Sequence, residues 1–164
     1  MERLRAVVAR ADRDAVLVEL AGLYGETAAY LPDSMIRGCG GQLSDYDQLD
    51  GTVAHSSCDL AARNTGTIFS VLGHMHEFGA SYRMTLHPDT PDERVLLDIP
   101  VWSFEWQLNY TPVEEIRIER GDTIRFECWW DRSLVHLKEP RYVTWNEGTV
   151  DEMCYSSIRV IPDP

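Results

Sequence analysis

The sequence has few basic residues and no long hydrophobic run. Its 164 residues include 15 lysines and arginines against 27 aspartates and glutamates, which gives a formal net charge of −12. A surface this acidic argues against binding to nucleic acid or to anionic membranes. No stretch approaches the roughly 18 consecutive apolar residues that a membrane-spanning helix needs. Because 44% of the residues are apolar, we expect a single domain that buries a substantial core.

A secretory signal is also missing from the sequence, since residues 1–8 are not followed by a long apolar stretch with a small-residue cleavage site. The cysteines point in the opposite direction. They are even in number, widely spaced and without a Cys-x-x-Cys pair: Cys39, Cys58, Cys128 and Cys154. This pattern is typical of two disulfides formed in an oxidising compartment, although four buried thiols in a cytosolic protein are the alternative. We therefore expect an exported or extracellular protein whose signal is absent from this chain.

The first part of the chain differs in pattern from the rest. Residues 1–37 predict a helical segment, because Asp12 can cap a run with apolar residues at helical spacing. Residues 38–66 are rich in Gly, Asp, Ser and Asn, which predicts an irregular loop. Cys39 and Cys58 bracket most of this loop, so a disulfide between them would tether it. All of this is expected to belong to one domain with the segment that follows.

From residue 67 to residue 164 the apolar residues recur with period two, which is typical of strands. Turn residues separate the candidates, among them Gly121-Asp122. Seven short strands with such spacing predict a mainly β fold, an antiparallel β-sandwich or jelly roll. The candidate strands are 68–77, which is apolar on both faces like a central strand, 81–87, 95–99, 115–119, 123–130, 142–145 and 154–161.

Two histidines stand two residues apart in Gly73-His74-Met75-His76. On a strand, side chains at i and i+2 leave the same face about 6.7 Å apart. Two imidazoles at this spacing can bind one metal ion between them. The alternative is a pair of polar side chains at a solvated strand end.

Met153 adds a soft donor. A thioether binds Cu(I) but not hard cations, so two imidazoles with one thioether favour copper over zinc. Period two also places Met153 and Cys154 on opposite faces of their strand. The alternative for a single methionine is a position in the core. We expect the remaining histidines, His55, His87 and His136, to lie in loops or on exposed faces, outside the metal site.

Residues 73–79, with the sequence Gly-His-Met-His-Glu-Phe-Gly, and residues 149–154, with the sequence Thr-Val-Asp-Glu-Met-Cys, together resemble a known family. It is the C-terminal domain of the copper type II, ascorbate-dependent monooxygenases, which include the peptidylglycine α-hydroxylating and dopamine β-monooxygenases. The resemblance implies one copper ion held by His74, His76 and Met153, and a disulfide between Cys128 and Cys154. It further implies hydroxylation of a C–H bond of a small substrate by O₂, with ascorbate or another reductant.

The chain also departs from the family pattern. Leu72, Tyr155 and Ser157 stand where the peptide-hydroxylating enzyme has Arg, Asn and Tyr, so a glycine-extended peptide is not the expected substrate. The three-histidine cluster of the family's second domain is missing, so an electron-donor domain or protein is expected as a partner. Apart from its copper ligands, the resemblance implies no catalytic residue. The alternatives are a non-catalytic copper-binding module for transfer or storage, a metal-free sandwich, and a cupin, whose Glu would follow the second His less closely than Glu77 does.

Overall fold

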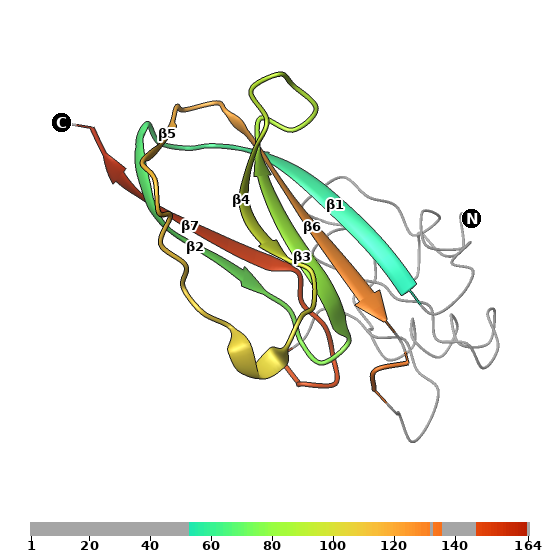
Figure 1. Ribbon diagram of the computed structural model, residues 1–164. Coiled ribbons are helices and arrows are strands. Elements are labelled where there is room, and N and C mark those ends of the chain that lie inside the picture. The colour runs from blue at the N-terminus through green and yellow to red at the C-terminus, as the bar shows by residue number, and fades with distance from the viewer. Residues whose placement is uncertain (1–52, 132, 136–146, 164) are drawn as a thin grey trace, which may run out of the picture.

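The computed structural model describes residues 53–131, 133–135 and 147–163, which are mainly β (Figure 1). A single 3-10 helix, η2, lies among them at Phe104–Trp106. No helix in these ranges is long and apolar enough to cross a membrane. The predicted helical segment 1–37, the strand candidate 142–145, Cys39 and His136 lie outside the described residues. The strands are β1 Val53–Ala61, β2 Gly66–His74, β3 Gly79–Leu86, β4 Arg94–Ile99, β5 Ile116–Ile118, β6 Thr123–Asp131 and β7 Tyr155–Pro162.

The strands form two antiparallel sheets, which fits the predicted β-sandwich. One sheet has the order β1-β6-β3-β4 and the other the order β5-β2-β7. Buried side chains from both sheets form one hydrophobic cluster, so the core lies between the sheets (Figure 1). Consecutive strands β2 and β3 belong to different sheets, so the chain crosses the sandwich directly after His74.

Strand β3 follows the period-two expectation closely, and strand β2 has the central position expected of it. In β3, Tyr82, Met84 and Leu86 are all buried, as their shared face predicts. Strand β2 lies between β5 and β7, and Ile68 and Val71 are buried there. Its partners on both sides make β2 the central strand of its sheet, although Phe69 on the same strand is 40% exposed. The central position predicted for this strand is therefore confirmed.

The irregular loop predicted for residues 38–66 is wrong for its last part. Residues 53–61 form β1, which pairs with β6 over its whole length, from Val53↔Asp131 to Ala61↔Thr123. The inward side chains of β1 are Ala54, Ser56 and Cys58, and all three are buried. These small or polar side chains give little hydrophobic alternation, so the segment has the composition of a loop although it has the burial pattern of a strand.

A disulfide joins the two sheets. Cys128 on β6 and Cys154, directly before β7, are bonded with their Cα atoms 6.0 Å apart, which confirms this predicted pair. Cys58 is disulfide-bonded too. Because Cys39 lies outside the described residues, the Cys39–Cys58 pairing stays a prediction.

Candidate metal centre

The His-x-His motif lies where the chain crosses from one sheet to the other. Strand β2 ends at His74, so the prediction that it continues through residue 77 is wrong, and His76 belongs to the connection. Met75 and Phe78 are both buried in the core. The amide of Gly79 donates to the carbonyl of His76 at 3.1 Å, which turns the chain into β3. The buried side chains of Met75 and Phe78, on either side of His76 in the sequence, thus fix its position.

Glu152 holds this connection through four hydrogen bonds. Its Oε1 accepts from the Phe78 amide at 3.0 Å. Its Oε2 accepts from the amides of His76 and Met153, at 3.1 and 3.0 Å, and from Trp130 Nε1 at 2.8 Å. Burial of the completely enclosed side chain raises the pKa of Glu152 to about 7, although the four N–H donors work in the other direction. Because His76 and Met153 donate to the same oxygen, their backbones are adjacent.

The two imidazoles lie side by side. Their ring centroids are 5.0 Å apart and their planes nearly perpendicular. Nδ1 of His74 is hydrogen-bonded to Oε1 of Gln107, and Nδ1 of His76 lies 3.3 Å from the carbonyl oxygen of Asp151. Each ring therefore has its Nδ1 engaged by an oxygen, which is the usual arrangement of metal-binding histidines. Among the residues that the structure describes, neither Nε2 atom has a hydrogen-bond partner, so both could face a ligand.

The local electrostatics favour an uncharged imidazole at His74. Burial lowers the pKa of His74; the hydrogen bond that its Nδ1 donates to Gln107 raises this pKa, and repulsion by His76 lowers it further. Since only the neutral ring has a lone pair to offer, a lowered pKa keeps His74 in the form that binds metals.

Met153 lies next to this pair along the backbone. It precedes β7 by two residues, and the first residue of β7, Tyr155, pairs with His74 on β2. The Met153 side chain is half-buried. Convergence of its sulfur on the two imidazoles stays a prediction. The donor set of two imidazoles and a thioether fits copper, Cu(I) above all. Within the described ranges, no three His, Cys, Asp or Glu side chains form a metal-binding group.

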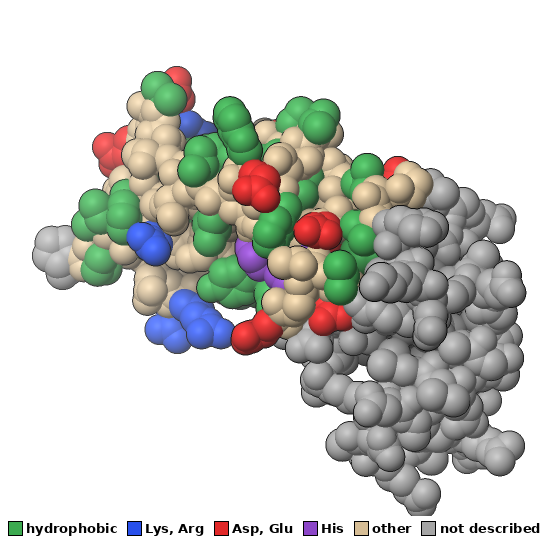
Figure 2. Space-filling view, turned by 90° about the horizontal axis from the view of Figure 1, so that it is seen from below, with side chains coloured by type: hydrophobic (Ala, Val, Ile, Leu, Met, Phe, Trp, Pro, Cys, Tyr) green, Lys and Arg blue, Asp and Glu red, His purple; other side chains and the backbone are tan. Residues whose placement is uncertain are grey.

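Two aromatic side chains border the imidazoles. Phe104 meets His76 edge to face at 5.8 Å between ring centroids, and Tyr155 lies 6.4 Å from His74 in the same manner. Tyr155, Trp106 and Leu108 are all about half exposed or more. Figure 2 shows histidine atoms at the surface, with hydrophobic side chains around them and acidic ones nearby. His76 itself is buried, at 4% exposure, and His74 is partly exposed, so the pair is largely enclosed, with two aromatic rings beside it.

Two other histidines lie elsewhere in the fold and have different partners. His55, on β1 and not in a loop, stacks on Trp129 at 4.4 Å and is hydrogen-bonded to Glu127. His87 follows β3, at the opposite end from the Gly79 turn, and its Nε2 lies 3.1 Å from the Asp122 carboxylate. Its side chain is 33% exposed, so it is less open than predicted.

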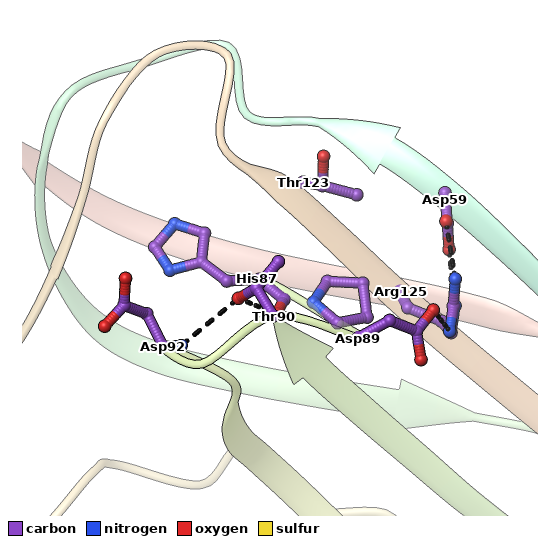
Figure 3. A pocket seen from close by; sticks show the side chains of 8 residues that line it. Asp59, His87, Asp89, Thr90, Asp92, Thr123 and Arg125 are labelled. Atoms are coloured by element: carbon purple, nitrogen blue, oxygen red, sulfur yellow. Dashed lines mark hydrogen bonds and ion pairs between the residues drawn. The ribbon is translucent and has the colours of Figure 1, made fainter.

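His87 lines a second, shallow hollow, shown in Figure 3. There Arg125 on β6 forms ion pairs with Asp59 and Asp89, each at 2.7 Å. These charges satisfy one another at the surface. The hollow therefore gives no sign of a metal or catalytic site.

Sequence reasoning missed two residues that shape the candidate site. Glu152 and Cys154 are two residues apart and both buried, so the inward position of the predicted disulfide cysteine was a signal that Glu152 points inward as well. Gln107 offered no such signal, because it lies 33 residues from His74 in a segment without a motif.

The chain matches no protein-family model, and no curated protein matches it.

Proposed function

We propose that this chain is a copper-binding domain of the copper type II monooxygenase kind, in which His74, His76 and Met153 bind one copper ion. Its reaction would be the hydroxylation of a C–H bond of a small substrate by O₂, with electrons from ascorbate or another reductant or from a partner. A jelly-roll arrangement of the sandwich and export from the cell belong to the same proposal. The disulfide between Cys128 and Cys154 supports an oxidising compartment.

One observation carries the proposal: two adjacent imidazoles have both Nδ1 atoms held by oxygen. Isolated surface histidines have no need of such support, whereas metal-binding histidines nearly always have it. The hydrogen bonds of Glu152 to the amides of His76 and Met153 add to this, because they join the two separate motifs at a buried carboxylate.

Each residue has a defined task in this proposal. Copper, when bound, would supply the activation of O₂. His74 and His76 would offer their Nε2 atoms, and the Met153 thioether would favour the monovalent ion. Glu152 would fix the connection and the methionine strand against each other. Phe104 and Tyr155, which border the imidazoles, would limit the access of water to the site.

A non-catalytic copper module is the second candidate function. Hydroxylation takes two electrons and one copper ion supplies one. The sequence has five histidines, and the two described ones outside the pair, His55 and His87, have carboxylate partners at separate places. This favours either an external electron donor or a role in copper transfer or storage.

Competition for Cu(I) against a chelator tests the site. We compare the wild type with Met153→Leu, which removes the sulfur but keeps an apolar side chain of similar size. Cu(I) affinity should fall at least about tenfold while Zn(II) affinity changes little, because the thioether matches only the soft ion. His74→Ala should weaken both metals. His55→Ala is the matched control, since it removes a histidine stacked on Trp129 instead.

Equal Cu(I) affinity in the wild type and Met153→Leu would show that Met153 is a packing residue and that the proposed ligand set is wrong. Oxygen consumption by the Cu(I)-loaded chain separates the two functions. A monooxygenase domain should react with O₂ and gain turnover from an added reductant. A storage module should keep Cu(I) from O₂ and give no product.

A further inference from the structure

We propose that Gln107 is a positioning residue that fixes the tautomer of His74, with the proton on Nδ1 and the lone pair on Nε2. Its importance for copper rests on the proposed function. The tautomer itself is a property of the metal-free chain and can be measured without any metal.

The orientation of the Gln107 amide is determined by its second contact. Its Nε2 donates to the carbonyl oxygen of Phe104 at 2.8 Å. A carbonyl can only accept, so the reversed amide would place two oxygens against each other. Oε1 of Gln107 must therefore face Nδ1 of His74. Because Oε1 also only accepts, Nδ1 must carry the hydrogen.

The segment that carries Gln107 is attached at both ends. The amide of Trp102 donates to the carbonyl of Ala80 on β3 at 2.8 Å. At the other end, Tyr110 exchanges two hydrogen bonds of 2.9 Å with Val71 on β2. Between these points the η2 turn, closed by the bond from Trp106 N to Ser103 O at 3.0 Å, presents Gln107 to His74. The acceptor is thus held in place before any ligand arrives.

His76 reaches the same tautomer by a different route. Its Nδ1 faces the backbone carbonyl of Asp151, which no substitution at residue 151 removes. The acceptor of His74 is a side chain and can be removed. The two rings therefore differ in one testable respect: a change at Gln107 should affect His74 and leave His76 as it is.

The test uses the full chain, metal-free and labelled with ¹⁵N-histidine, at a pH where both imidazoles are neutral. Long-range ¹H–¹⁵N correlation spectra report which ring nitrogen carries the hydrogen. In the wild type both rings should have it on Nδ1. In Gln107→Met, which keeps the length but has no strong acceptor, His74 should populate the Nε2–H form and His76 should not change.

Gln107→Glu distinguishes the hydrogen bond from a general effect on the segment. This variant keeps an acceptor for His74 but loses the donor to Phe104, so a merely structural role would make it behave like Gln107→Met. We expect it to retain the Nδ1–H form. In Cu(I) competition, Gln107→Met should bind about 10- to 100-fold more weakly than the wild type, which is typical for loss of a hydrogen bond to a ligand.

An Nε2–H His74 in the wild type, or an unchanged His74 in Gln107→Met, would overturn the proposal. If the tautomers respond as expected but the wild type binds no Cu(I), the role of Gln107 stands and the copper site is refuted.

Discussion

Replacing Glu152 by glutamine tests how the connection between β2 and β3 is held. The carboxylate accepts four N–H bonds, one at Oε1 and three at Oε2. Glutamine has one accepting oxygen. If that oxygen takes the place of Oε2, the bonds from His76, Met153 and Trp130 survive. The new NH₂ group then faces the amide of Phe78, so two buried donors lose their partners.

Each unsatisfied buried donor costs about 1–3 kcal/mol. The neutral amide recovers part of this, because a buried charge is no longer required. We therefore expect Glu152→Gln to lower the free energy of unfolding by about 2–4 kcal/mol. The opposite amide orientation would leave four donors without an acceptor, the three N–H groups at Oε2 and the NH₂ group that faces them, and would cost more.

Urea unfolding at neutral pH with the disulfides intact measures this change, with Glu119→Gln as the matched control at an exposed site. Amide hydrogen exchange reports the change at each backbone position: in Glu152→Gln the Phe78 amide should lose more of its protection against exchange than the His76 amide. A loss of stability below about 0.5 kcal/mol, or uniform changes at both amides, would refute the claim that this carboxylate holds the connection.

Three further predictions concern stability. Burial raises the pKa of Glu152 from 4.5 to about 7, so the folded state binds this proton more tightly than the unfolded state, and the stability of the wild type should decrease as the pH rises from about 4.5 to about 7. In urea titrations at a series of pH values, Glu152→Gln should lack this decrease; a pH profile identical to that of the wild type would contradict the prediction. Replacing Cys128 and Cys154 by serine opens a link of sequence separation 26 and should cost about 3–4 kcal/mol by chain entropy, read from the denaturation midpoint; a loss below about 1 kcal/mol would mean that the link adds little. Gly79→Ala would place a Cβ 2.6 Å from Trp102 Cδ1 and should lower the free energy of unfolding by about 1–3 kcal/mol. At Gly148 the nearest atom to such a Cβ is the end of the Asp151 side chain, which can move aside, so Gly148→Ala should have the smaller effect in thermal unfolding.

The regular strands could be predicted because their physics is local. Alternation in Tyr82, Met84 and Leu86 follows directly from strand geometry. The turn at Gly121, which has a φ of 99°, matches the freedom that only glycine has there. In contrast, β1 buries alanine, serine and cysteine, so its strand character depends on its pairing with β6 and on no pattern of its own.

Of the candidate site, the sequence predicted only the residues that we propose as ligands. The spacing of His74 and His76 and the soft donor at Met153 are visible in the sequence. Their supports are not, because Gln107 and Glu152 act across 33 and 76 residues. The sequence pattern also predicted that the strand includes His76, whereas β2 ends at His74 and the chain turns between the buried side chains of Met75 and Phe78. Tertiary packing decides such a turn, and local periodicity does not report it.

The disulfide and the Trp130–Glu152 hydrogen bond connect the same two segments at neighbouring positions. Trp130 follows Cys128 by two residues and Glu152 precedes Cys154 by two, so the covalent and the polar contact are spaced like successive cross-strand pairs. Reduction of the disulfide alone would thus leave the segment before β7 attached to β6 by the carboxylate. Loss of the covalent link would therefore not by itself release Met153, because its attachment depends on a redox-sensitive bond and on a separate polar contact that reduction does not touch.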